Sequence, residues 1–204
     1  MRFHYRAGWL ALNCLGRVAF GFKVKGREHI PREGGVVIAS NHVSYADPPV
    51  VGSAVPREVY FMAKEELFRN PVFGWLISRY NAIALRRAVG DLGAVKKAVE
   101  LLKQGRAVLM FPEGTRSLSG RLLKPKPGVG LIACLAGVVV VPAHVTGTDR
   151  LGRALLRRER LAVSFGEPVD PAGFTTGAGD RQGYQKLTDE VMRRIEDLAR
   201  QEPA

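Results

Sequence analysis

Residues 36–47 read VVIASNHVSYAD, and this stretch decides the fold. It begins with an apolar run, Val36 to Ala39, which is the pattern of a short strand buried on both faces. The strand leads directly into a polar turn that contains His42. Asp47 and the two prolines after it then predict the start of a helix, with the aspartate at the N-cap and proline in the first turn.

The alternation of apolar strands and helices continues on both sides of this stretch. Further strands are predicted at 59–62, 82–85, 107–111, 138–141 and 161–165, and helices at 71–80, 91–104, 131–136 and about 182–200. Gly105 stands where a C-terminal glycine cap belongs. Because the strands are apolar throughout, we expect an α/β fold with a mostly parallel central sheet and helices on both faces.

Length and composition are those of one ordinary globular domain. The chain has 204 residues, of which 46% are hydrophobic and 25% charged, and this mixture argues against intrinsic disorder. Cys14 and Cys134 are too few for a disulfide scaffold or a zinc cluster. We divide the chain into an N-terminal amphipathic helix, residues 1–22, and a main domain, residues 23–204.

The charge balance indicates an anionic partner. Lysine and arginine number 31 against 19 acidic residues, which leaves a formal net charge of +12. Such an excess favours nucleic acid, an anionic membrane surface or a phosphorylated substrate. Aromatic residues make up only 8%, and no known nucleic-acid motif is present, so the sequence favours the other two partners.

The N-terminal segment has the composition of a membrane-surface helix. It holds no run of about 20 apolar residues, so a simple single-span anchor is not supported. Apolar Phe3, Trp9 and Leu10 instead alternate with basic Arg2 and Arg6, as in helices that lie among lipid headgroups. The alternative is a terminal helix that simply covers the core of the domain, and the sequence favours neither.

His42 and Asp47 are the first candidates for chemistry. Five residues apart, they would point to different sides of a regular helix, so they meet only if the segment turns. If they meet, Asp47 keeps one imidazole nitrogen protonated and leaves the other to take a proton. Since the sequence lacks a Gly-x-Ser-x-Gly elbow, such a pair fits a reaction in which the substrate's own hydroxyl attacks. The alternative is that His42 is an ordinary turn residue and Asp47 only caps a helix.

A second polar turn, residues 111–117 with the sequence FPEGTRS, also follows a predicted strand. Ligands gather at the carboxyl ends of parallel strands, so we expect both turns to face one cleft. Arg116 offers a planar guanidinium suited to phosphate, and Glu113 can accept a hydrogen bond from a substrate hydroxyl. Taken alone, the same residues also fit a surface turn with an internal ion pair. Arg86 and Lys126 add cations elsewhere.

Four blocks, in this order and spacing, resemble the glycerolipid acyltransferases, especially those that acylate 1-acyl-glycerol-3-phosphate (lysophosphatidate). The blocks are Asn41-His42-x4-Asp47, residues 64–87 (KEEL through NAIALRR), residues 111–117 and residues 138–142. Together they cover about residues 25–170. Asn81 and Ala84 depart from the pattern, because family members often carry glycine and proline there.

The resemblance implies an acyltransferase that moves a fatty acyl group from acyl-CoA or acyl-carrier protein to lysophosphatidate, giving phosphatidate. It implies that His42 is the general base and Asp47 its orienting partner, with no covalent enzyme intermediate and no metal or cofactor. The acceptor-binding residues that it implies are Arg86, Glu113, Gly114, Arg116 and Lys126. With the net charge, it implies an anionic membrane surface as partner rather than nucleic acid, and peripheral or monotopic attachment to the cytoplasmic face of the cell membrane.

Two other readings stay open at this point. The enzyme could acylate a different acceptor, such as another lysophospholipid or an acyl-amine lipid. The chain could also be a non-catalytic basic protein that binds anionic membranes or nucleic acid.

Overall fold

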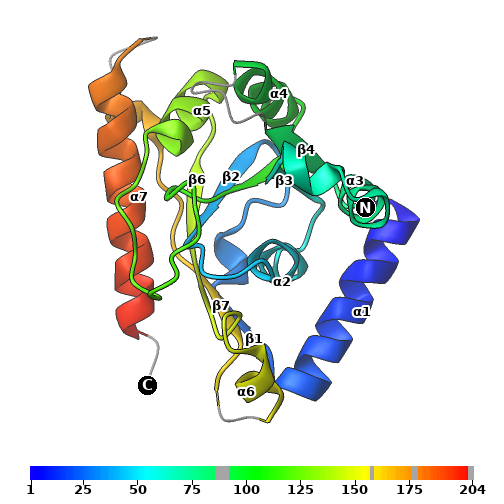
Figure 1. Ribbon diagram of the computed structural model, residues 1–204. Helices are drawn as coiled ribbons and strands as arrows, with labels where there is room; N and C mark the ends of the chain where they lie inside the picture. Colours follow the sequence, from blue (N-terminus) through cyan, green and yellow to red (C-terminus); the bar gives the residue numbers. More distant parts are fainter. Residues whose placement is uncertain (86–91, 157–158, 176–178, 202–204) are drawn as a thin grey trace.

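A central sheet organises the molecule, as the computed structural model shows for residues 1–85, 92–156, 159–175 and 179–201 (Figure 1). Its strands are β1 (Lys23–Lys25), β2 (Val36–Ser40), β3 (Val59–Lys64), β4 (Ala82–Leu85), β5 (Ala107–Met110), β6 (Val140–Thr146) and β7 (Ala162–Phe165). They are arranged in the order β1-β7-β6-β2-β5-β3-β4. Every neighbouring pair is parallel except β6 and β7, which confirms the predicted fold class.

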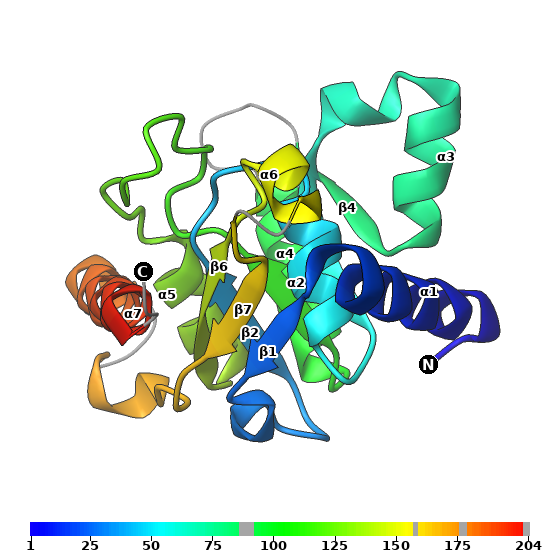
Figure 2. The ribbon, with the colours of Figure 1, turned by 90° about the horizontal axis from the view of Figure 1, so that it is seen from below.

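Helices cover both faces of this sheet (Figures 1 and 2). They are α1 (Phe3–Phe20), α2 (Asp47–Ala54), α3 (Pro71–Arg79), α4 (Leu92–Lys103), α5 (Gly128–Ala136), α6 (Leu151–Leu155) and α7 (Arg181–Gln201), with short 3₁₀ turns η1 (Arg27–His29), η2 (Glu65–Phe68) and η3 (Pro171–Gly173). Helices α4, α5 and α7 pack on one face, and α2 and α6 pack on the other. No helix in the described ranges is both long enough and apolar enough to cross a bilayer.

Strand β2 shows why the strands carry apolar residues at every position. Val36 and Ile38 face the core under α2, whereas Val37 and Ala39 face the core under α4, α5 and α7. All four side chains are fully buried. Burying a valine or isoleucine side chain contributes about 1.5–3 kcal/mol, so both faces of the strand stabilise the sheet.

Strand β6 corrects one predicted boundary. The strand expected at 138–141 begins at Val140 and continues through Pro142 to Thr146. Proline is tolerated there because Pro142 lies between the bridge from Val140 to Val169 and the β7 ladder, which begins at Ala143. The missing N–H therefore falls in a break of the ladder, while the Pro142 carbonyl accepts from Gly166 N–H at 2.9 Å.

Two short elements were not expected from the sequence. Strand β1 has only three residues at the edge of the sheet, and its two lysines are exposed, so it lacks an apolar signal. Helix α6 lies in an arginine-rich segment, residues 150–160, for which the sequence predicts solvated surface. Its Ala154 is nevertheless completely buried. In both cases tertiary contacts stabilise a segment whose own sequence indicates little structure.

The departure at Asn81 has a backbone reason. Asn81 lies directly before β4 and has φ 68°. It is the only residue other than glycine with positive φ in the described ranges. Asparagine tolerates this left-handed conformation better than most residues, so it replaces a glycine at modest cost. Its buried side chain also donates to the Val59 carbonyl and accepts from the Arg2 guanidinium, which links α1 to the sheet.

Helix α1 packs on the domain by one side only. Tyr5, Asn13 and Gly16 are buried, and the Trp9 indole N–H donates to the Val55 carbonyl at 2.8 Å. The helix ends at Gly21, which adopts the left-handed conformation of a glycine C-cap. The helix therefore covers part of the core, and its opposite side faces outward.

Candidate active site

The structure brings His42 and Asp47 together. Asp47 opens α2, and the chain turns back so that His42 Nδ1 lies 2.7 Å from Asp47 Oδ2. Because a carboxylate only accepts hydrogen bonds, Nδ1 carries the proton and Nε2 is the unprotonated nitrogen of the neutral ring. The Asp47 side chain is fully buried, whereas that of His42 remains 16% exposed. The pair therefore has one buried end and one end that a substrate can reach.

Asp47 organises the turn rather than capping its helix. Its Oδ2 accepts backbone N–H groups from Val43 at 2.7 Å and Ser44 at 2.8 Å, in addition to the His42 ring. These donors precede the helix, so the carboxylate does not serve the free N–H groups of the first turn of α2. The alternative in which Asp47 acts only as a helix cap is therefore not what the structure shows.

Thr148 is a partner that sequence reasoning missed. Its hydroxyl, buried just beyond the end of β6, donates to Asp47 Oδ1, the oxygen that the histidine turn leaves free. Both oxygens of the buried carboxylate are thus hydrogen-bonded, which fixes its plane. The two residues are 101 positions apart, and no local pattern in the sequence connects them.

Glu113 joins the two polar turns, as their position at neighbouring strand ends predicts. Its Oε1 accepts the backbone N–H of His42 at 2.9 Å, and its Oε2 accepts the N–H of Leu123 at 2.9 Å. A third bond runs from Ser117 N–H to the His42 carbonyl at 2.7 Å. The buried carboxylate therefore fixes the backbone of the histidine relative to the second turn.

Burial shifts the pKa of Glu113. Desolvation raises the pKa of this carboxyl, and the N–H groups of Leu123 and His42 lower it in part. A pKa that is higher in the folded state means that the folded protein holds this proton more readily than the unfolded chain. Glu113 alone therefore makes the fold less stable as pH rises through its titration range.

Gly114 of the second turn lies next to Lys126, which follows on the same loop. Gly114 has φ 68°, and a Cβ there would lie 3.1–3.2 Å from Cδ and Nζ of Lys126. The backbone N–H of Lys126 donates to the Pro112 carbonyl at 2.9 Å, which closes the loop. The exposed lysine side chain thus lies next to the glycine, on the same loop as Glu113.

Arg116 lies over an aromatic ring of the first turn. Its guanidinium carbon is 3.6 Å from the centroid of the Tyr45 ring. Throughout the ranges that the structure describes, no carboxylate pairs with this guanidinium. The internal ion pair of the surface-turn alternative is therefore absent, and the edge of the guanidinium is available to an anion. Arg86, the remaining predicted cation, lies outside the described residues.

Asn41 and Phe111 complete the site and were also missed as contacts. The side-chain amide of buried Asn41 bonds Val145 in both directions, at 3.0 Å to its carbonyl and 2.8 Å from its N–H. It thereby ties the end of β2 to β6. The Phe111 ring stacks on the His42 ring, with centroids 4.0 Å apart and an angle of 18° between the planes. The stack holds the imidazole in one orientation.

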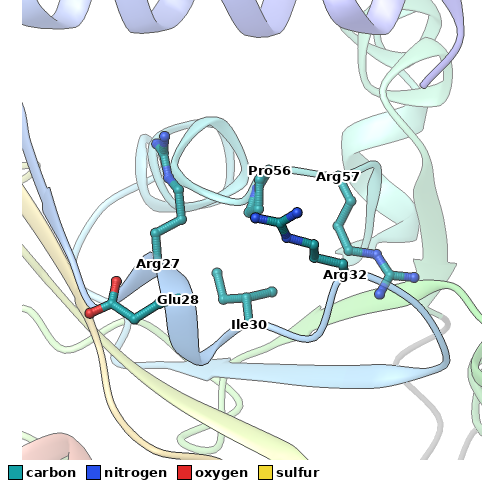
Figure 3. A pocket seen from close by; sticks show the side chains of 6 residues that line it. All are labelled: Arg27, Glu28, Ile30, Arg32, Pro56 and Arg57. Carbon is teal, nitrogen blue, oxygen red and sulfur yellow. The ribbon is translucent and has the colours of Figure 1, made fainter.

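A hollow of about 620 Å³ lies elsewhere on the molecule (Figure 3). Its lining residues are Arg27, Glu28, Ile30, Arg32, Pro56 and Arg57. They precede β2 or follow α2, near the amino ends of β2 and β3, whereas His42 follows the carboxyl end of β2. Arg57 donates to backbone carbonyls of Pro31, Gly34 and Gly105, so it stabilises the loops around the hollow. None of the predicted site residues that the structure describes lines it.

The fold and the site together define a class of protein. An α/β domain presents a histidine–aspartate pair and an arginine stacked on a tyrosine at the carboxyl edge of its parallel strands. That arrangement suits proton transfer on a substrate that carries an anionic group.

Comparison with known proteins identifies the family. Residues 21–146 match the model of the Acyltransferase family, so the chain belongs to this family and is an enzyme. It is 30% identical over 189 residues to a 1-acyl-sn-glycerol-3-phosphate acyltransferase of Bacillus subtilis (strain 168), covering 92% of this chain and 93% of the relative. It is 33% identical to a lyso-ornithine lipid O-acyltransferase of Pseudomonas aeruginosa, covering 88% of this chain and 75% of that one.

A solved structure supports the same family assignment. The crystal structure of the 1-acyl-sn-glycerophosphate (LPA) acyltransferase PlsC from Thermotoga maritima superposes with a TM-score of 0.72 at 31% sequence identity. The match covers 100% of this chain and 86% of the other.

Proposed function

We propose that this enzyme transfers a fatty acyl group from a thioester donor to the free hydroxyl of 1-acyl-glycerol-3-phosphate, giving phosphatidate for phospholipid synthesis. The observation that carries the proposal is the hydrogen-bonded His42–Asp47 pair, whose loop is joined to the loop that carries Arg116. No carboxylate in the described part of the chain pairs with that guanidinium. The similarity to the Bacillus and Thermotoga acyltransferases supports this choice of acceptor.

In this mechanism Nε2 of His42 takes the proton of the acceptor hydroxyl as its oxygen attacks the thioester carbonyl carbon. A C–O bond forms, and the tetrahedral intermediate then collapses with cleavage of the C–S bond. The imidazolium returns its proton to the departing thiolate, so the histidine ends each cycle neutral. Asp47 remains ionised and stabilises the imidazolium through Nδ1. Acyl-CoA and acyl-carrier protein present the same thioester, and the mechanism accepts either donor.

Arg116 is proposed to bind the phosphate of the acceptor, together with Lys126. A guanidinium edge forms two parallel hydrogen bonds to phosphate oxygens, and Lys126 adds a second positive charge from the same loop. Arg86, implied by the family resemblance, would add a third cation. Glu113 contributes indirectly, because its carboxylate is occupied with the backbone of His42 and Leu123.

Replacing Arg116 tests the function. We expect Arg116→Ala to lower kcat/KM for lysophosphatidate about 10- to 100-fold, because a hydrogen bond to a charged group contributes about 1.5–3 kcal/mol. Acylation of monoacylglycerol, which has no phosphate, should change little. Arg121→Ala, which removes an exposed arginine from the same loop, serves as the control. An equal loss on both acceptors would contradict the phosphate role.

A second acceptor has a specific observation in its favour. The relative from Pseudomonas aeruginosa is named for lyso-ornithine lipid, and it matches over most of this chain. An ornithine lipid lacks a phosphate group, so it would not use Arg116 in the same way. Wild-type turnover of lyso-ornithine lipid above that of lysophosphatidate, with either thioester donor, would favour this alternative.

We further propose that α1 attaches the enzyme to an anionic membrane surface as a peripheral or monotopic protein, on the cytoplasmic face. At 100° per residue, Phe3, Leu15 and Val18 lie on the side of α1 opposite the packed residues. Their side chains are strongly exposed, Phe3 at 89% and Val18 at 71%. Arg6 and Arg17 lie on the same helix and can contact lipid phosphates.

Combined replacement of Phe3, Leu15 and Val18 by serine should abolish most vesicle binding. Each apolar side chain contributes about 1.5–3 kcal/mol when fully buried. Because the three side chains insert only in part, we expect their loss to lower the partition coefficient onto vesicles about 100-fold. Sedimentation with vesicles that contain phosphatidylglycerol measures it. Leu118→Ser, at a loop residue that is also 89% exposed, is the control. Unchanged binding of the triple variant would exclude α1 as the attachment.

A further inference from the structure

Tyr45 occupies an exposed position that packing does not explain. The residue lies in the turn between His42 and Asp47, and 67% of its surface is exposed. Its ring contacts the Arg116 guanidinium, whose central carbon lies 3.6 Å from the ring centroid. A distance this short places the cation in van der Waals contact over the ring face, as in a cation–π pair.

Both partners of this contact belong to loops that are held by hydrogen bonds. On one side, the Asp47 carboxylate accepts the backbone N–H groups of Val43 and Ser44, which fixes the turn that carries Tyr45. On the other side, Arg116 lies between Glu113 and Ser117, and both of these residues bond the backbone of His42. The tyrosine ring and the guanidinium therefore face each other from two loops that are joined at the histidine.

The two surfaces of a guanidinium serve different partners. The ring of Tyr45 covers the flat face of Arg116, whereas phosphate oxygens accept from the N–H groups along the edge. Stacking thus leaves the donors free and removes much of the rotational freedom of a long side chain before the substrate arrives. An arginine ordered in this way loses less entropy on binding than a free one.

We propose that Tyr45 is a positioning residue for acceptor recognition: its ring holds the Arg116 guanidinium in the orientation that receives the phosphate of the acceptor. This inference rests on the proposed function, in which Arg116 binds that phosphate. Tyr45 takes no part in proton transfer, so its removal affects the affinity for the acceptor and leaves the chemical step and the thioester donor unaffected.

The test measures kcat and KM separately for lysophosphatidate and for the acyl donor in Tyr45→Leu and Tyr45→Phe. The leucine variant lacks the ring, and we expect its KM for lysophosphatidate to rise about 2- to 5-fold, the effect of one exposed cation–π contact. Its kcat and its KM for the donor should stay at wild-type values. The phenylalanine variant keeps the ring and should behave as the wild type does.

The same measurements in an Arg116→Ala background separate this inference from the proposed function. If Tyr45 acts through Arg116, Tyr45→Leu adds nothing once the arginine is gone. An equal effect in both backgrounds, a wild-type KM in Tyr45→Leu, a fall in kcat, or a phenylalanine variant that resembles the leucine variant would each overturn the role of Tyr45. Failure of the proposed function looks different, because Arg116→Ala would then leave the KM for lysophosphatidate unchanged.

Discussion

The His42→Ala variant is expected to fold normally and to lose about 10²- to 10⁴-fold in kcat, the usual contribution of a positioned general base. Among the described residues of the site, only His42 has a ring whose Nδ1 bonds a carboxylate, that of Asp47, and whose Nε2 can take a proton. Its removal therefore leaves the acceptor hydroxyl without a proton acceptor. Initial rates of phosphatidate formation from acyl-CoA and lysophosphatidate measure the loss.

Folding of this variant needs an independent check. Because the Glu113 and Ser117 bonds use the backbone of His42, they persist when the side chain is shortened to alanine. Thermal unfolding and vesicle binding should therefore remain close to those of the wild type. Turnover equal to the wild type in a folded variant would refute the assignment of the base.

The Asp47→Asn variant is expected to lose on the order of 10⁴-fold in kcat, the loss that the same change causes in a Ser-His-Asp triad. The N–H groups of Val43 and Ser44 keep an oxygen next to Nδ1, so the asparagine preserves the tautomer but lacks the negative charge that stabilises the imidazolium. The variant has almost the same volume as the native residue, so the change tests charge rather than packing. Steady-state rates with lysophosphatidate provide the measurement.

Thr148→Val is the matched control for Asp47. It removes the hydroxyl that contacts Oδ1 but keeps the carboxylate, and therefore the tautomer of His42. We expect a loss in kcat less than a tenth as large as that of Asp47→Asn. Equal losses in the two variants would mean that the orientation of the Asp47 side chain, rather than its negative charge, limits the rate.

The fold followed from patterns that are local in the sequence. Apolar runs such as Val36 to Ala39 are bounded by polar turns, and this pattern predicts a parallel sheet without knowledge of strand order. The meeting of the turns at His42 and Glu113 followed from one topological rule, since β2 and β5 are neighbours and both turns lie at their carboxyl ends.

The contacts that refine the site were not predictable in the same way. Thr148 reaches Asp47 across 101 residues, and Asn41 reaches Val145 across 104. Such contacts depend on strand order and on the length of β6, which Pro142 obscured in the sequence. The stacking of Arg116 on Tyr45 depends on the shapes of two loops, and neither loop shape is encoded by a periodic pattern.

The most direct test of the central claim is the pH dependence of kcat/KM for lysophosphatidate, measured between about pH 5 and 8, where histidine side chains change charge. The account predicts that the wild-type value rises with pH as one group loses a proton and then levels off. In His42→Ala the small residual activity should be independent of pH over this range. Burial raises the pKa of Glu113, whose carboxyl group is present in both proteins, so the comparison of the two profiles isolates the histidine. The same rising profile in His42→Ala would contradict the account, because the proton would then belong to a group other than the histidine.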